Sequence, residues 1–308
     1  RIAQSGRKGP VLVDIPKDVT AAVCEFTPKQ PERIRTVTTY DEQQVKWAAD
    51  IINAAKRPLV YFGGGVRSAA SCQPLRDLIH KAEIPATYTL MAAGVVPYGD
   101  PMNIGMVGMH GCYTSNRAVA DCDVLIALGT RFSDRVALNP KTFARNATII
   151  QIDIDPNEIE NARSIACPVV GDIKSAMQMI NAGLEKTPVK ASAQWLDMLK
   201  ADAEKNDAKF AARVNSNTVP MGHYDALGAI KKVYDQHKDM ILTNEGANTL
   251  DDCRNIIDIY QPRHRLDCGT WGVMGCAVGY SIGAAVAPGK PVLYVGGDSG
   301  FGFDGMEV

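Results

Sequence analysis

The chain ends on a glycine-rich turn that carries an aspartate, GGDSGFGFDGMEV (296–308). The residues before it, PVLYV (291–295), predict a β-strand, and Met306–Glu307 look like the opening of a helix. A turn between a strand and a helix is a common anion or metal site in open α/β sheets, because ligands collect at the carboxyl ends of the strands. Mg²⁺ prefers one or two carboxylates together with phosphate oxygens. Asp298 is therefore a candidate metal ligand, with a plain tight turn capped by the aspartate as the alternative.

Two further stretches could contribute to a ligand site near this turn. GTWGVMG (269–275) lies upstream of it, although a methionine such as Met274 is by itself more typical of an apolar core. NEGAN (244–248) follows an apolar strand, where a ligand would bind in an α/β sheet. An equally good interpretation of that stretch is a helix cap formed by Asn248.

Composition indicates an ordinary globular protein. The 308 residues suggest about two domains. A net charge of −1 gives no reason to expect nucleic acid or an anionic membrane as a partner, and no apolar run approaches the roughly 20 residues that cross a bilayer. The eight cysteines form no CxxC motif and are typical of reduced thiols in the cytoplasm, and a zinc site is not expected.

Apolar strands alternate with amphipathic helices, which predicts an α/β fold with a mostly parallel sheet and helices on both faces. Strands are expected over 10–16, 58–62, 85–90, 123–128, 148–154, 240–244 and 291–295. Helices are expected over 41–55, 71–82, 115–120, 173–184, 224–236, 249–259 and 274–286. A connecting helix in 185–218 separates two α/β units, with a boundary near Val219.

With these motifs the chain resembles the thiamine-diphosphate-dependent enzymes of the acetolactate synthase superfamily. In that family the aspartate of a Gly-Asp-Gly/Ser turn and a later asparagine bind Mg²⁺, which holds the cofactor's diphosphate; the asparagine would follow Val308. The resemblance implies that Mg²⁺ is held by Asp298. It also implies that Met274 is the apolar residue that lies beneath the cofactor and holds its two rings in a bent conformation. It implies that thiamine diphosphate contacts Glu245, Gly272, Val273, Met274, Gly297, Asp298 and Ser299.

The resemblance has two parts. Residues 1 to about 155, with SGRKGPVLVDIPKDV, TLMAAGVVP and GMVGMHGCYTSNRAVADCDVLIALGTRFSDRV, are similar to the catalytic subunit of acetolactate synthase. Residues from about 166 onward, with CPVVGDIKSA, TNEGANTLDD, PRHRLDCGTWGVMG and GDSGFGFDGME, are similar to oxalyl-CoA decarboxylase and 2-hydroxyacyl-CoA lyase. Both lead to the same superfamily.

In the acetolactate synthases the central domain binds FAD, and in oxalyl-CoA decarboxylase it holds an ADP-type nucleotide. RFSDRV and GMHG favour FAD here, with ADP or CoA as the alternative. Glycines allow close approach to a pyrophosphate, Asp153 could bind a ribose hydroxyl and Arg131 a phosphate or carboxylate. Without a ligand, His110 would be a plain loop residue and Arg131 a solvated charge. The implied contacts are Gly63, Gly64, Thr89, Leu90, Gly108, Met109, His110, Gly111, Arg131, Asp134, Arg135, Asp153 and Asp172.

The resemblance also implies a domain organisation. Residues 1–30 would be the tail of a pyrimidine-binding domain, 31–185 the central FAD- or nucleotide-binding domain, 186–218 a linker, and 219–308 the first part of the diphosphate-binding domain. The glutamate that protonates the aminopyrimidine would lie outside this chain, so the chain alone is expected to be inactive. A cytoplasmic homodimer or tetramer is expected, and a regulatory small subunit is a further partner that the resemblance allows.

The function implied first is acetolactate synthase, in which two pyruvates give acetolactate and CO₂ during branched-chain amino acid biosynthesis. In that reaction Arg131 would orient the carboxylate of the second 2-keto acid. The alternative is an acyl-CoA substrate, as in the loss of CO₂ from oxalyl-CoA to give formyl-CoA, or a 2-hydroxyacyl-CoA lyase. A hypothesis of another class is a non-catalytic module that binds FAD or another nucleotide.

Overall fold

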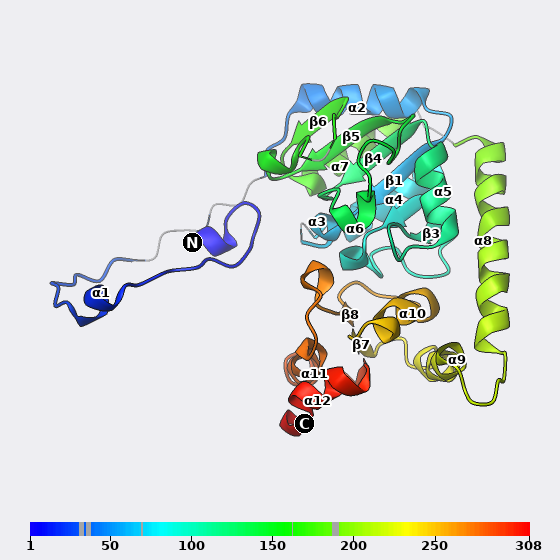
Figure 1. Cartoon of the computed structure of the whole chain (residues 1–308). Coiled ribbons are helices and arrows are strands. Elements are labelled where there is room, and N and C mark those ends of the chain that lie inside the picture. The colour runs from blue at the N-terminus through cyan, green and yellow to red at the C-terminus, as the bar shows by residue number, and fades with distance from the viewer. Residues whose placement is uncertain (31–33, 35–37, 69, 162, 187–190) are drawn as a thin grey trace.

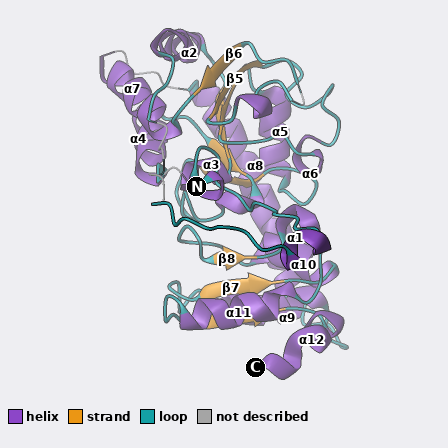
Figure 2. Ribbon diagram, turned by 90° about the vertical axis from the view of Figure 1, so that its left-hand side faces the viewer, coloured by secondary structure: helices purple, strands orange, loops and turns teal. Residues whose placement is uncertain are grey.

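The chain forms two parallel β-sheets, each with its own helices (Figure 1). The computed structural model describes residues 1–30, 34, 38–68, 70–161, 163–186 and 191–308. The domain boundary expected after residue 30 and residues 187–190 of the expected linker fall outside the described residues. The larger sheet lies above the smaller one in Figure 2.

The larger sheet has six strands in the order β3-β2-β1-β4-β5-β6, all parallel. The two central strands, β1 and β4, are buried along their whole length, as expected when helices cover both faces. The order in which the chain forms the strands reverses between β1 and β4, because β1 to β3 extend towards one edge of the sheet and β4 to β6 towards the other. In open α/β sheets ligands bind at such a switch point. The strands are β1 (Pro58–Phe62), β2 (Ala86–Tyr88), β3 (Asn103–Met106), β4 (Val124–Leu128), β5 (Thr148–Asp153) and β6 (Cys167–Val170).

Helices cover both faces of this sheet. One apolar core joins it to α2 (Glu42–Ala54), α4 (Cys72–Ala82) and α7 (Ile173–Lys186). A second core on the opposite face joins it to α5 (Tyr113–Asp121) and α8 (Ala193–Val214). The remaining short elements of this part are α1 (Lys17–Ala21), α3 (Gly64–Ser68) and α6 (Asp134–Ala137), with 3₁₀ turns at Ile2–Gln4, Leu90–Ala92 and Pro156–Glu158.

The smaller sheet has three parallel strands in the order β8-β7-β9. Its strands are β7 (Ile241–Asn244), β8 (Arg265–Leu266) and β9 (Val292–Val295). Its helices are α9 (His223–Tyr234), α10 (Asn248–Ile256), α11 (Cys276–Val286) and α12 (Asp298–Asp304), with 3₁₀ turns at Gly269–Trp271 and Gly305–Glu307. The long helix α8 runs beside both parts and packs against α5 and α9 (Figure 1).

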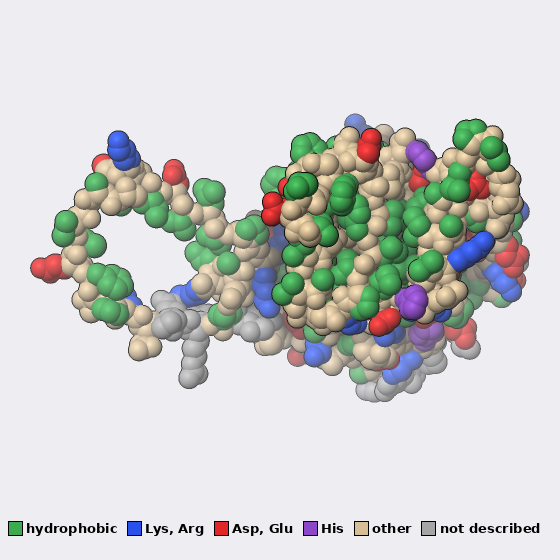
Figure 3. All heavy atoms as spheres, turned by 90° about the horizontal axis from the view of Figure 1, so that it is seen from below, with side chains coloured by type: hydrophobic (Ala, Val, Ile, Leu, Met, Phe, Trp, Pro, Cys, Tyr) green, Lys and Arg blue, Asp and Glu red, His purple; other side chains and the backbone are tan. Residues whose placement is uncertain are grey.

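The face around α11 and α12 is apolar and exposed. Hydrophobic side chains gather on the face turned towards the viewer in Figure 3, which shows the molecule from below. The exposed apolar residues of α11, α12 and the 3₁₀ turn that follows are Tyr280, Ile282, Val286, Phe301, Phe303 and Met306. An apolar surface of this kind commonly marks an interaction site.

The structure differs from the expected elements in a few places. Residues 10–16 pair with no described strand and expose Leu12 and Val13, because no neighbouring strand is there to complete a ladder. The closing helix begins at Asp298 instead of Met306, and α11 begins at Cys276, so Met274 lies in a loop. No helix in the described part of the chain is both long and apolar enough to cross a membrane.

Candidate functional site

A cleft of about 920 Å³ opens at the carboxyl ends of β1 and β4, where the strand order of the larger sheet reverses. The N-terminal residues contribute to its wall, and so do α10 and the loop after β8. Ten of the thirteen residues expected to contact a nucleotide line it: Gly63, Gly64, Thr89, Leu90, Met109, His110, Arg131, Arg135, Asp153 and Asp172. The structure therefore brings residues from the carboxyl ends of all six strands of the larger sheet to one cavity.

Glycines form the floor of this cleft. The amide of Gly63 donates to the carbonyl oxygen of Leu128 (2.9 Å), and the amide of Gly65 donates to that of Gly129 (3.2 Å). A β-carbon added to Gly65 would lie 2.6 Å from Cα of Gly129, a distance that real structures do not show. The turns after β1 and β4 can pack this closely only because neither carries a side chain here.

Gly108, Gly111 and Asp134 are outside the cleft lining. Gly108 has φ of +112° and lies so close to Arg135 that a β-carbon would be 2.8 Å from its carbonyl oxygen. In Gly111 a β-carbon would be 2.4 Å from the carbonyl oxygen of Met106. The two glycines thus shape the loop that presents Met109 and His110, while Asp134 is the exposed first residue of α6.

The carboxylates of the cleft differ in what they already bind. Asp153 is buried, which raises its pKa, and its Oδ1 accepts the amide of Asp155 (3.0 Å). Asp172 accepts the amide and the hydroxyl of Ser175 at 2.8 and 2.7 Å, so it caps the first turn of α7. His110 pairs through Nδ1 with Asp251 of α10 (3.4 Å), which links the two halves of the chain.

Some polar atoms beside the cleft have no partner in the described structure. The hydroxyls of Tyr61 and Thr130 are buried and face each other, and neither makes a hydrogen bond of ordinary geometry within the described residues. Nε of Arg254, whose side chain is 8% exposed, is also unpaired among the described residues. All three residues line the cleft. Buried polar groups are nearly always satisfied, so this arrangement fits a polar ligand.

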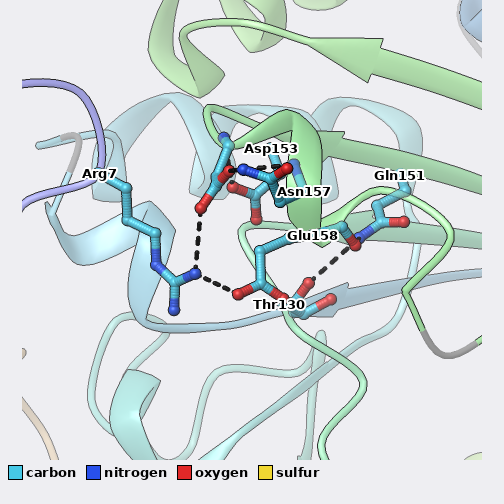
Figure 4. Close-up of polar contacts among 7 residues, drawn as sticks. Arg7, Thr130, Gln151, Asp153, Asn157 and Glu158 are labelled. Carbon is cyan, nitrogen blue, oxygen red and sulfur yellow. Dashed lines mark hydrogen bonds and ion pairs between the residues drawn. The ribbon is translucent and has the colours of Figure 1, made fainter.

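The N-terminal segment is tied to the cleft by Arg7. Its guanidinium contacts Asp155 at 3.2 Å and also pairs with Glu158, both in the loop after β5 (Figure 4). Gln151 supports this loop by donating to the carbonyl oxygen of Glu158 (2.8 Å). Sequence reasoning missed Arg7 and Arg254, because neither stands in a recognisable spacing with the other cleft residues.

A second group of expected site residues lies at the carboxyl edge of the smaller sheet. The loops after β7 and β9 are in contact there, since a β-carbon on Gly246 would be 3.5 Å from the amide nitrogen of Gly297. Asp298 is exposed and accepts only the amide of Ser299 (2.8 Å) among the described residues. Its carboxylate is therefore available to a cation, and phosphate oxygens could complete an octahedral Mg²⁺ shell.

The remaining members of this group differ in burial. Glu245 is fully buried, whereas Val273 and Met274 are 48% and 46% exposed. Gly272 adopts φ of +65° in the loop between them and β8. None of the residues expected to bind thiamine diphosphate lines the large cleft, although Gly269 and Thr270 of the same loop do. No group of three or more His, Cys, Asp or Glu residues in the described ranges could hold a metal without outside ligands.

Comparison with known families defines the class of protein. Residues 45–180 match the family model "thiamine pyrophosphate enzyme, central domain", and residues 246–308 match "thiamine pyrophosphate enzyme, C-terminal TPP binding domain". The two models together cover more than half of the chain, which therefore belongs to the thiamine pyrophosphate enzymes. This confirms the α/β fold and the family expected from the sequence.

Individual relatives are of two kinds. The chain is 38% identical to oxalyl-CoA decarboxylase of Escherichia coli K12 over all of its length and 54% of the relative. It is 36% identical to the acetolactate synthase isozyme 1 large subunit of the same organism, over 97% of the chain and 51% of the relative. An acetolactate synthase of Mycobacterium bovis is 35% identical over all of the chain and 50% of the relative. The chain spans about half the length of these curated relatives, and both kinds match along nearly all of it.

Proposed function

We propose that the protein containing this chain is an enzyme that uses thiamine diphosphate to break or form a carbon–carbon bond beside a carbonyl group. The observation that carries this proposal is the exposed Asp298 carboxylate at the carboxyl end of β9, beside the loop after β7. The match of this region to a TPP binding domain supports it. When bound, the thiazolium supplies an electron sink for the cleaved bond.

The chain's own residues would position that cofactor. Asp298 would hold the Mg²⁺ that neutralises the diphosphate, with Gly297 and Ser299 beside it at the start of α12. Gly272, Val273 and Met274 would contact the cofactor from the loop before α11, with Met274 beneath its rings. The half-exposed side chain of Met274 leaves room for such a contact. The carboxyl group of Glu245 faces the protein interior, where it accepts hydrogen bonds from Tyr294 and Ala277.

We propose FAD as the ligand of the large cleft, with ADP or CoA as the alternative. Its volume and its glycine floor suit a dinucleotide. Arg131 and Arg135 would pair with phosphate oxygens, and Asp153 would accept a ribose hydroxyl. The purified intact protein is expected to carry a yellow chromophore that is released on denaturation, and a colourless extract containing ADP would favour the alternative.

Two reactions are consistent with the relatives. In an acetolactate synthase reaction, Arg131 would orient the carboxylate of the second 2-keto acid, as its exposed place on the cleft wall allows. An acyl-CoA substrate is larger than a 2-keto acid and would need additional space beside the large cleft. A neighbouring cavity of about 450 Å³ would supply it, since this cavity shares His110 with the large cleft. Polar side chains of Lys209, Asn206 and Asn255 line the cavity.

Feeding the intact protein pyruvate and oxalyl-CoA separately, with thiamine diphosphate and Mg²⁺, tests the proposal. Acetolactate without formyl-CoA would support the synthase, and the reverse would support the decarboxylase. Neither product from these or from other 2-keto acids and acyl-CoA substrates, with a flavin still bound, would leave the non-catalytic nucleotide-binding module as the better description. Chain 1–308 alone is expected to be inactive.

We also propose the domain bounds 1–30, 31–185, 186–218 and 219–308, and a homodimeric or homotetrameric assembly. The apolar face of α11 and α12 suits such an assembly. A regulatory small subunit and a cytoplasmic location belong to the same proposal. Light scattering of the intact protein, with and without a co-purifying subunit, tests the assembly.

A further inference from the structure

Glu245 is a buried carboxyl group that the protein itself engages on both oxygens. It is fully inaccessible, and glutamate is almost never so buried without partners. Oε1 accepts the hydroxyl of Tyr294 (2.8 Å), and Oε2 accepts the amide of Ala277 in the first turn of α11 (3.4 Å). Its carboxyl group therefore joins the end of β7 to β9 and α11, instead of pointing into an open site.

Two glycines make room for this contact. A β-carbon on Gly300, in α12, would lie 2.9 Å from Cδ of Glu245. A β-carbon on Gly296 would lie 2.1 Å from the Tyr294 hydroxyl, since residues two apart on an extended chain point to the same side. The tyrosine ring thus covers Gly296, and it also packs against Phe301 of α12 at a centroid distance of 6.0 Å.

The tyrosine is the donor in this pair. Burial and the hydrogen bond to Glu245 raise the pKa of Tyr294, so its hydroxyl keeps its proton. Glu245 also donates its own amide to the carbonyl oxygen of Val295 (3.2 Å), directly before the glycine turn. Nδ2 of Asn244, the last residue of β7, donates to the same carbonyl oxygen (2.7 Å). The end of β7 and the turn that leads to Asp298 are consequently held together by one backbone bond and two side-chain bonds, and of these two side-chain bonds only the Tyr294–Glu245 bond reaches the loop after β7.

We propose that Tyr294 is a positioning residue of the thiamine diphosphate site, whose hydrogen bond to Glu245 fixes the Asp298 turn against the loop after β7. This inference rests on the function proposed above. Loss of the hydroxyl leaves the ring packing on Phe301 intact, so the fold changes little. The turn loses one of its two side-chain bonds to the end of β7 and the loop after it, while the bond from Asn244 to Val295 remains. Asp298 then no longer meets the metal and diphosphate in one fixed place.

The test compares Tyr294→Phe with the matched control Tyr280→Phe in the intact protein. Tyr280 is a partly exposed tyrosine of α11 whose hydroxyl makes no hydrogen bond within the described residues. Calorimetric titration with thiamine diphosphate and Mg²⁺ is expected to give a dissociation constant about tenfold higher for Tyr294→Phe, equivalent to about 1.4 kcal/mol, and an unchanged one for the control. Nucleotide content and the unfolding midpoint should stay near the wild-type values in both.

A double-mutant cycle gives a readout that general damage would not produce. Glu245→Gln keeps an acceptor for Tyr294, so its cofactor affinity is expected to lie between those of the wild type and Tyr294→Phe. The double variant is expected to bind no more weakly than Tyr294→Phe alone, because both substitutions act on one bond. Gly296→Ala, which displaces the tyrosine hydroxyl from the other side, should give the same loss.

The positioning role would be overturned if Tyr294→Phe bound thiamine diphosphate as tightly as the wild type. It would also be overturned if the weaker binding came with lost nucleotide and a lower unfolding midpoint. Additive losses in the cycle would do the same. Failure of the proposed function gives a different result: the wild-type protein would then bind no thiamine diphosphate at all, or Asp298→Asn would bind it as tightly as the wild type.

Discussion

Gly63 and Gly129 pack backbone against backbone where the strand order of the larger sheet reverses. A β-carbon on Gly63 would lie 2.4 Å from the carbonyl oxygen of Gly129, which leaves no space for any side chain. This approach sets the distance between the turns after β1 and β4. It therefore also places Thr130 and Arg131, which follow Gly129, on the wall of the cleft.

Gly63→Ala is expected to lower the free energy of unfolding by about 1–3 kcal/mol, because the overlap must be relieved by moving a backbone segment. Bound nucleotide should be lost as well. Gly183→Ala in α7 is the matched control, since its β-carbon meets open space and should raise stability by roughly 0.5–1 kcal/mol. Thermal unfolding and ligand content measure both. Equal effects of the two substitutions would contradict this account of the floor.

Arg131→Ala is expected to weaken nucleotide binding by about tenfold or more, because a hydrogen bond to a charged group contributes about 1.5–3 kcal/mol. Arg131→Lys should recover only part of the loss, since an ammonium cannot form a bidentate pair. Equilibrium dialysis of the apoprotein with FAD and with ADP measures both. Arg145→Ala, an exposed arginine outside the cleft, should bind as the wild type does. An unchanged affinity in Arg131→Ala would remove this residue from the site.

Asp298→Asn is expected to abolish the Mg²⁺ dependence of thiamine diphosphate binding, with an affinity loss of about tenfold or more. The effect follows from removing the charge that the metal needs, while the amide can still bond to Ser299. Asp304→Asn, which changes another exposed carboxylate on α12, is the control and should retain the dependence. Titrations with and without Mg²⁺ distinguish the two. Retained dependence in Asp298→Asn would show that another residue is the ligand.

Asp225 makes the connection between α8 and α9 sensitive to acid. Its carboxylate accepts bonds from Ser216, Thr218, Gly222 and Asn217, and the hydroxyls of the first two contribute most to lowering its pKa to about 2. A folded-state pKa below that of the unfolded chain, about 3.9, means that this stabilisation is complete above about pH 4. It is lost as the pH falls towards 2.

Hydrogen exchange of residues 215–222 is therefore expected to accelerate between about pH 4 and pH 2, beyond the intrinsic pH dependence of exchange. Asp225→Asn should exchange faster at pH 6 and show little further change on acidification. Asp239→Asn, at an exposed aspartate outside this cluster, should keep the wild-type profile. A wild-type profile in Asp225→Asn would mean that other groups hold the connection closed.

Local patterns predicted most of the central elements. The apolar runs of β1, β4 and β5 and the amphipathic repeat of α2 were enough to place them. Three strands escaped prediction: β3 and β6 form the two edges of the larger sheet, and β8 forms one edge of the smaller sheet. Each pairs on one side only, so a short and partly exposed sequence suffices there. Residues 10–16 have a strand-like sequence but no described partner strand.

The sequence alone determined the parallel α/β arrangement, the glycine turns and the candidacy of Asp298, because strand burial and chain reversal depend on near neighbours. Only the tertiary structure showed that Arg7 and Arg254 reach the large cleft and that Tyr294 bonds to Glu245, 49 residues away. Such contacts depend on how strands are ordered in a sheet and how two sheets stack. No local preference encodes that order, since the free energy of pairing is realised only when distant segments meet.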